Sequence, residues 1–263
     1  MEVDITQTHL WQGQTVDLAV KRASRSDNSQ PGFVWLGGFR SDMLGGKAQT
    51  MVEEAQRMGA ASLRFDYSGH GLSGGAFRDG TISRWVDESC AVFRRQTEGP
   101  QVLIGSSMGA WIALRLCLEL MHSDEAHRIC GMILIAPAAD FTAVLMEPTF
   151  TPQQRQDLES KGYVEEESAY SDEPNIITKS LIDDGRSNLV LGEPLKLGCP
   201  VHILQGMQDP DVPYTHALQL VGSLAQDDVV MTLIKDGDHR LSRDNDLELL
   251  ARTMRDILRT ATQ

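Results

Sequence analysis

The sequence has few cysteines and no long apolar stretch, and each shortage excludes a class of protein. Its four cysteines stand far apart, with neither a CxxC pair nor the spacing of a metal site: Cys90, Cys117, Cys130 and Cys199. No apolar run approaches the ~20 residues that a membrane-spanning helix needs. We therefore expect reduced thiols, no bound metal and no membrane span.

Basic charge is also scarce. The chain carries 24 Lys and Arg against 37 Asp and Glu, which gives a formal net charge of −13. Nucleic acids and anionic membranes bind clustered basic side chains, so neither is an expected partner. The first residues, MEVDI, lack the basic and apolar regions of a signal peptide. Together with the scattered cysteines, this start predicts a cytoplasmic location.

Apolar strands and amphipathic helices alternate along the chain after an opening hairpin at residues 8–12 and 15–22. The length of 263 residues fits a single α/β domain. Strand–helix alternation predicts a mostly parallel central sheet with helices on both faces. The predicted strands are 33–36, 61–65, 101–104, 129–135, 201–204 and 229–234, and the predicted helices are 47–58, 82–96, 110–116, 214–224 and 243–258.

One segment interrupts this alternation. Between Pro137 and Leu195 the pattern is irregular, with Pro148, Pro152, Pro174 and the acidic run Glu165 to Glu167. A long irregular segment inside a compact domain is often a functional lid. We interpret residues 138–195 as a small cap insertion over the active site, with short helices at 153–161 and 175–184. The acidic run is interpreted as a solvated face.

The most informative motif is Gly-Ser-Ser-Met-Gly at residues 105–109. It lies between an apolar strand and a helix, which is the setting of a nucleophile elbow, a sharp turn that exposes a serine. The flanking backbone comes so close to the serine that the positions two before and two after it need glycine. Ser107, and not Ser106, is centred between Gly105 and Gly109, so Ser107 is the predicted nucleophile.

A serine nucleophile needs a base and a third group that orients the base. Asp209 follows the predicted strand 201–204, and His239 follows the strand 229–234. Active sites of open α/β sheets form at the carboxyl ends of the strands, so Ser107, Asp209 and His239 should meet. Asp211 is the rival acid, although it could instead cap the helix that begins near Pro213. His70 is the rival base, because it also follows a strand closely.

The developing oxyanion needs preorganised donors. Met108 N–H, at the start of the elbow helix, is the first predicted donor. The second should come from the glycine turn after the strand 33–36, and Phe39 N–H is our choice. A plain glycine turn is the alternative there.

A second glycine motif, Gly69-His70-Gly71-Leu72-Ser73-Gly74, matches the GxGxxG pattern of dinucleotide sites. That pattern requires a helix to begin at the motif, since the helix N-terminus binds the pyrophosphate. Here a loop continues through Gly80, so we do not expect a dinucleotide. With no P-loop, HExxH or Cys/His cluster in the sequence, no cofactor is predicted.

Together these segments resemble the α/β-hydrolase family, from about Gln30 onward. Within this family, the short sequence motifs are most similar to those of the mitochondrial acyl-protein thioesterase and acyl-glucuronide esterase group. The motifs are RFDYSG at 64–69, GSS at 105–107 with Gly109 and Trp111, Gly206-Met207 with Asp209, and Asp238-His239-Arg240. The resemblance implies ester or thioester hydrolysis by Ser107, Asp209 and His239, with Asp66 and His70 in structural roles.

The sequence thus predicts a serine hydrolase that cleaves carboxylic esters or acyl thioesters through an acyl-enzyme on Ser107. A peptidase or lactonase on the same triad, and a ligand-binding protein on an inactive scaffold, are the alternatives. A long acyl chain would contact apolar residues of the cap, namely Phe141, Leu145, Met146 and Phe150. The oligomeric state has no signal in the sequence.

Overall fold

An eight-stranded sheet forms the centre of the molecule. The computed structural model describes residues 2–24, 30–123, 125–166, 175–224 and 227–261. The strand order is β1-β2-β4-β3-β5-β6-β9-β10. Its members are β1 (Glu2–Trp11), β2 (Gln14–Ala23), β3 (Gly32–Leu36), β4 (Ser62–Phe65), β5 (Gln101–Ser106), β6 (Ile129–Ile135), β9 (Val201–Gly206) and β10 (Val229–Ile234).

The sheet from β4 to β10 is parallel, as predicted. The opening hairpin is longer than predicted and is part of the same sheet, because β2 pairs antiparallel with β4. The parallel strands β3 to β6 are almost entirely buried, which agrees with their unbroken apolar sequences.

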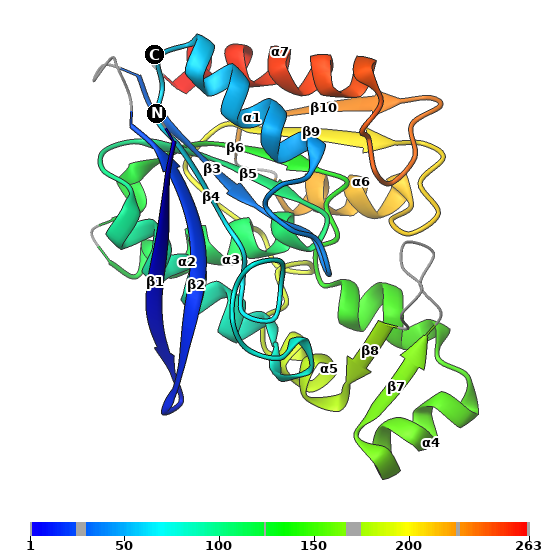
Figure 1. The fold of residues 1–263 in the computed structure, drawn as a ribbon. Helices are drawn as coiled ribbons and strands as arrows, with labels where there is room; N and C mark the ends of the chain where they lie inside the picture. The colour runs from blue at the N-terminus through cyan, green and yellow to red at the C-terminus, as the bar shows by residue number, and fades with distance from the viewer. Residues whose placement is uncertain (1, 25–29, 124, 167–174, 225–226, 262–263) are drawn as a thin grey trace.

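Helices cover both faces of the sheet (Figure 1). Helices α1 (Gly46–Arg57) and α7 (Asp244–Ala261) lie on one face. Helices α2 (Ile82–Gln96), α3 (Met108–Met121) and α6 (Tyr214–Ser223) lie on the other. Strand side chains alternate between the two cores: Phe33 and Trp35 of β3 pack with the first pair of helices, and Val34 and Leu36 with the second group. The predicted two-faced α/β architecture is confirmed.

The cap segment lies between β6 and β9, at the lower right of Figure 1. It contains a π-helical turn (Thr142–Met146), a 3-10 turn (Glu147–Thr149), α4 (Pro152–Lys161), a two-stranded sheet of β7 (Tyr163–Glu166) and β8 (Asn175–Thr178), and α5 (Lys179–Arg186). Two more 3-10 turns lie outside it, at Phe77–Asp79 and Ala126–Arg128.

The predicted helix 153–161 is confirmed by α4, but the predicted helix 175–184 is wrong over its first part. Residues 175–178 form β8, and the helix begins only at Lys179. The β-branched Ile176 and Ile177 favour a strand, and Thr178 caps α5 by accepting a hydrogen bond from Leu181 N–H. The sequence also missed β7, which includes Glu165 and Glu166 of the acidic run; Glu167 lies outside the described residues.

The cap has a small core of its own. Five buried side chains form it: Phe150, Leu158, Val164, Ile177 and Ile182. Met146 packs against both this cluster and the large core of the sheet. The cap also packs on the large core through Leu181 of α5, so more than one of its elements attaches it to the sheet.

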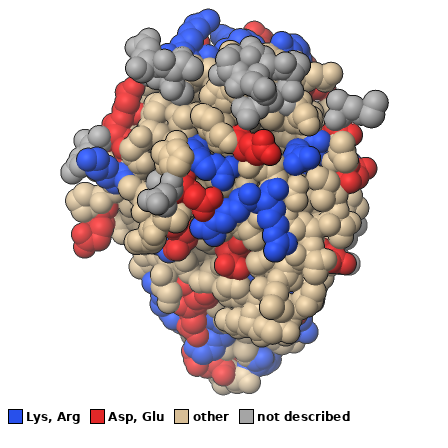
Figure 2. Space-filling model, turned by 90° about the vertical axis from the view of Figure 1, so that its left-hand side faces the viewer, with Lys and Arg blue, Asp and Glu red and all other residues tan. Residues whose placement is uncertain are grey.

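The distribution of charged side chains and the character of the helices both agree with what the composition predicts. In the view of Figure 2, basic and acidic side chains are intermingled. Across the described ranges, no helix combines the length and the apolar character needed to cross a membrane.

Candidate active site

Ser107 sits on a strained turn between β5 and α3. Its φ of 55° and ψ of −119° lie in a region that residues with a Cβ rarely adopt. The turn also brings backbone against backbone: a Cβ added to Gly105 would lie 2.4 Å from Gly109 O, and one added to Gly109 would lie 2.0 Å from Leu36 O. Both predicted glycine requirements of the elbow therefore have a steric cause.

Three side chains meet at the carboxyl end of the sheet. His239 Nε2 lies 3.0 Å from Ser107 Oγ, and His239 Nδ1 lies 2.8 Å from Asp209 Oδ2. The Asp209 side chain is fully buried, whereas the His239 side chain is 17% exposed. Ser107 follows β5, Asp209 follows β9 and His239 follows β10. The structure thus brings together the three residues that the sequence nominated, in a serine–base–acid chain.

The Asp209 carboxylate is held from several sides. Its Oδ1 accepts hydrogen bonds from the N–H groups of Asp211 at 2.9 Å and Val212 at 2.8 Å. Gln205 Nε2 donates to Oδ2 at 3.2 Å. These donors fix the carboxylate in the orientation that contacts the imidazole. Gln205 was missed in the sequence, because a lone glutamine at the end of an apolar strand carries no motif.

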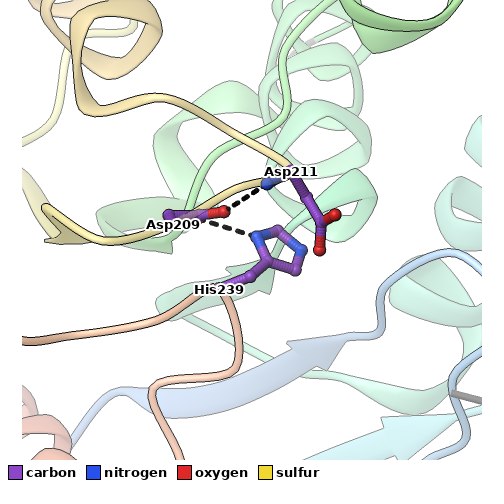
Figure 3. Close-up of side chains that lie close together, drawn as sticks. All are labelled: Asp209, Asp211 and His239. Carbon is purple, nitrogen blue, oxygen red and sulfur yellow. Dashed lines mark hydrogen bonds and ion pairs between the residues drawn. The ribbon is translucent and has the colours of Figure 1, made fainter. Parts of the chain in front are cut away.

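Asp211, the rival acid, is exposed. The acid that bonds to His239 Nδ1 is Asp209. It contributes its backbone N–H to the Asp209 carboxylate. Its expected alternative role is wrong, since α6 has Pro213 at its N-cap and no side chain caps it. Figure 3 shows the Asp211 carboxylate beside the imidazole, on the side away from Asp209.

The segments that carry the two predicted oxyanion donors lie next to Ser107. Met108 N–H opens α3, and the loop after β3 passes so close that a Cβ on Gly38 would lie 3.4 Å from Ser107 Cβ. Neither Met108 N–H nor Phe39 N–H donates to an acceptor within the described residues. The arrangement leaves both N–H groups free to bind a substrate oxygen.

His70, the rival base, is hydrogen-bonded to the loop after β3. The Ser68 carbonyl can only accept, so His70 Nδ1–H donates to it at 3.2 Å, and Nε2 then accepts from Arg40 N–H at 3.2 Å. Burial lowers the pKa of His70 to about 4, so the ring is neutral. Both ring nitrogens are engaged, and neither contacts Ser107. These hydrogen bonds indicate a structural role for His70, which holds Arg40, the residue after Phe39.

Asp66 is structural as well. Its two carboxylate oxygens accept from Met43 N–H at 2.7 Å and Leu72 N–H at 2.8 Å. Burial raises the pKa of Asp66. A Cβ on Gly71 would overlap this carboxylate, which explains the second glycine of the GxGxxG pattern. The described chain after Gly74 continues as a loop and a 3-10 turn, as expected for a motif that does not bind a dinucleotide.

The four predicted acyl contacts have different surroundings. Phe141 is buried beside the oxyanion loop, with its ring 5.7 Å from that of Phe39 and 5.5 Å from that of Trp111. Leu145 and Met146 are half-buried against the large core. Phe150 lies instead in the cap's own core. The structure thus groups Phe141 with the oxyanion loop and does not bring Phe150 there.

Asp209, Asp211 and His239 are also the single group of potential metal ligands among the described residues, with one ligand atom of each within 4.8 Å of the others. Hydrogen bonds already account for their arrangement, because Asp209 uses both oxygens and His239 uses both ring nitrogens. The absence of a metal remains a prediction.

Lys47 is a further residue that sequence reasoning missed. Its Nζ on α1 donates to Arg240 O, next to His239, and lies 3.4 Å from Ser242 Oγ. Burial lowers the pKa of Lys47 to about 8. The contact ties the loop that carries His239 to α1.

Comparisons with known proteins found relatives of this chain in sequence and in structure. A family model described as serine aminopeptidase, S33, matches residues 42–161. The mouse (Mus musculus) protein named palmitoyl-protein thioesterase ABHD10, mitochondrial, is 32% identical over 243 residues, which cover 92% of this chain and 79% of that protein.

Solved structures extend the likeness to the whole fold. A putative hydrolase from Agrobacterium vitis S4 superposes with a TM-score of 0.95 at 49% identity, over 98% of this chain and 99% of that one. The mouse α/β-hydrolase domain-containing protein 10 gives a TM-score of 0.84 at 30% identity, over 97% of this chain and 99% of that one. The likeness therefore includes the opening hairpin, which lay outside the stretch beginning at Gln30.

Proposed function

Since this chain belongs to the α/β-hydrolase family and is a hydrolase of the esterase or thioesterase type, we propose that it cleaves its substrates through an acyl-enzyme on Ser107. The observation that carries the proposal is the continuous hydrogen-bond chain from Ser107 Oγ through His239 to Asp209. A ligand-binding scaffold has no need for a strained serine joined to a base and a buried acid.

The proposed mechanism gives each of these residues one part in acyl transfer. His239 Nε2 removes the Ser107 proton as Oγ attacks the carbonyl carbon of the ester or thioester. Asp209 accepts the Nδ1–H bond and stabilises the imidazolium that forms. The N–H groups of Phe39 and Met108 hold the oxyanion, and each such donor contributes about 10²- to 10³-fold in rate. His239 then protonates the leaving group, and water repeats the cycle on the acyl-enzyme.

An apolar acyl chain is the substrate class that we favour. The mouse relative is named a palmitoyl-protein thioesterase, and the side chains beside the oxyanion loop here are Phe141 and, at the cap attachment, Leu145 and Met146. A panel of acyl thioesters of graded chain length tests this preference. Equal kcat/KM at all lengths would count against it.

A fluorophosphonate probe tests the nucleophile itself. We expect the wild-type protein to be labelled and to lose activity, because the activated Oγ attacks phosphorus as it attacks a carbonyl. Ser107→Ala should abolish labelling and lower kcat by at least about 10³-fold. Ser106→Ala is the matched control, since Ser106 is adjacent but belongs to β5. Equal labelling of wild type and Ser107→Ala would refute the proposal.

The location of the protein is a separate proposal. We favour the cytoplasm, a reducing compartment, because all four cysteines are free thiols in the structure. Imaging of the tagged full-length protein tests it, and a mitochondrial signal, as in the names of the mammalian relatives, would contradict it.

A further inference from the structure

The exposed carboxylate of Asp211 lies beside His239 of the proposed triad and has no role in the mechanism described above. Asp211 belongs to the loop between β9 and α6, with Pro210 before it and Pro213 two residues after it. One of its carboxylate oxygens lies within 4.8 Å of a ring nitrogen of His239. Figure 3 shows it on the side of the imidazole opposite to Asp209. Asp211 therefore places a carboxylate close to the general base.

This inference rests on the proposed mechanism, which assigns a proton transfer to the side of the His239 imidazole that Asp211 faces. Asp209 occupies Nδ1, so the proton of the leaving group must come from Nε2. A group near the open side of the imidazole therefore faces the departing alcohol or thiol. In the proposed mechanism we expect the acyl chain elsewhere, toward the oxyanion loop and Phe141.

The second acid of the pair has a different environment from the first. Asp209 is fully buried and bonded to donors on several sides, whereas Asp211 is exposed. Other charged side chains at this edge are Asp238 and Arg240, which flank His239 in sequence and are exposed. Asp238 is turned toward its own loop, where its Oδ1 accepts from Leu241 N–H at 3.0 Å.

We propose that Asp211 determines leaving-group specificity: its carboxylate favours esters and thioesters with a cationic leaving group and disfavours those with an anionic one. For the size of the effect, we take a separation on the order of 6 Å between the carboxylate and a charge on the second carbon of the leaving group. In a largely aqueous surrounding, Coulomb's law then gives a preference of about three- to ten-fold for each unit of charge.

Three butyryl thioesters of equal length provide the test. Their leaving groups are thiocholine, 2-mercaptoethanol and 2-mercaptoethanesulfonate, which carry positive, zero and negative charge on the same two-carbon thiol. The kcat/KM of each is measured by thiol release, and the cationic-to-anionic ratio in a variant is divided by that in wild type. This double ratio cancels the different intrinsic reactivity of the three thioesters.

We expect Asp211→Asn to lower the cationic-to-anionic ratio by about three- to ten-fold per unit charge, and Asp211→Glu to keep most of it. Glu248→Gln on α7 removes an equal charge from an exposed position on the helix and should leave the ratio unchanged. In wild type the ratio should shrink as salt rises, because ions screen an exposed charge. This salt series needs no variant and so stands even if Asp211→Asn folds poorly.

An unchanged ratio in Asp211→Asn, or a wild-type ratio insensitive to salt, would overturn this inference while leaving the hydrolase proposal intact. Failure of wild-type protein to hydrolyse any of the three thioesters, or the matching oxygen esters, would instead overturn the proposed function, and this inference with it.

Discussion

At the scale of single residues, backbone strain and hydrogen bonding distinguish Ser107 and Asp209 from their neighbours. Ser107 has a positive φ that Ser106 does not share. Asp209 is buried against His239, and Asp211 is not. Two adjacent serines and two nearby aspartates thus have unequal roles: only Ser107 has the strained turn of the elbow, and only Asp209 is buried against the imidazole.

The role of Asp209 leads to a prediction about non-additivity. Asp209→Asn should lower kcat by about 10³- to 10⁴-fold, because the amide no longer fixes the tautomer of His239. The double variant with Ser107→Ala should be no slower than Ser107→Ala alone, since the triad acts as a unit. Steady-state kinetics on one thioester checks both statements. An additive loss would show that Asp209 acts outside the triad.

At the scale of elements, the loop after β3 depends on a neutral histidine. His70 accepts from Arg40 N–H only while its Nε2 is unprotonated. Burial lowers the pKa of His70 to about 4 in the folded chain, against about 6.5 in the unfolded chain. The unfolded state therefore takes up the proton first as pH falls, and folding stability is lost between these two values.

We predict a loss of stability of about 2 kcal/mol from this residue between pH 7 and pH 5. Urea unfolding at the two pH values measures it. His70→Gln should be less stable than wild type at pH 7 but should lose less on going to pH 5. Equal losses in both proteins would mean that His70 is not the titrating group. His216, whose pKa burial also lowers, contributes in the same direction in both proteins.

The cap is an element with its own core, so it should unfold locally. Ile177→Ala removes a fully buried side chain from that core, at a cost of about 2–5 kcal/mol. Hydrogen exchange should then quicken in α4, β7 and α5 while β3 and β5 stay protected. Hydrolysis of a short acetyl ester should persist. Uniform acceleration across the sheet would instead show that cap and sheet unfold together.

At the scale of the whole molecule, the thiols distinguish a serine enzyme from a cysteine enzyme. Burial raises the pKa of Cys90 to about 12, of Cys117 to about 12 and of Cys130 to about 11, and it also raises the pKa of Cys199. Thiolates react and thiols do not, so N-ethylmaleimide at pH 7 should leave activity within two-fold over about an hour. All four thiols should react once the protein is unfolded in guanidinium. Rapid inactivation of the folded protein would contradict this account.

Sequence patterns predicted most of the fold and the triad, and they failed where long-range contacts decide. Parallel strands and the glycines of the elbow have local signatures, so Ser107, Asp209 and His239 could be placed at one sheet edge. Residues 175–178 could not be assigned correctly, because their strand exists only through pairing with β7. The contribution of Gln205 and the position of Phe150 in the cap core likewise depend on folding that brings distant segments together.

Capture of the acyl-enzyme tests the central claim most directly. Wild-type protein mixed rapidly with excess p-nitrophenyl butyrate and quenched in acid should gain the mass of one butyryl group, and peptide mapping should place it on Ser107. Ser106→Ala should gain the same adduct, and Ser107→Ala should gain none. Turnover with no adduct on Ser107, or an adduct on any other residue that forms and decays at the catalytic rate, would contradict the account.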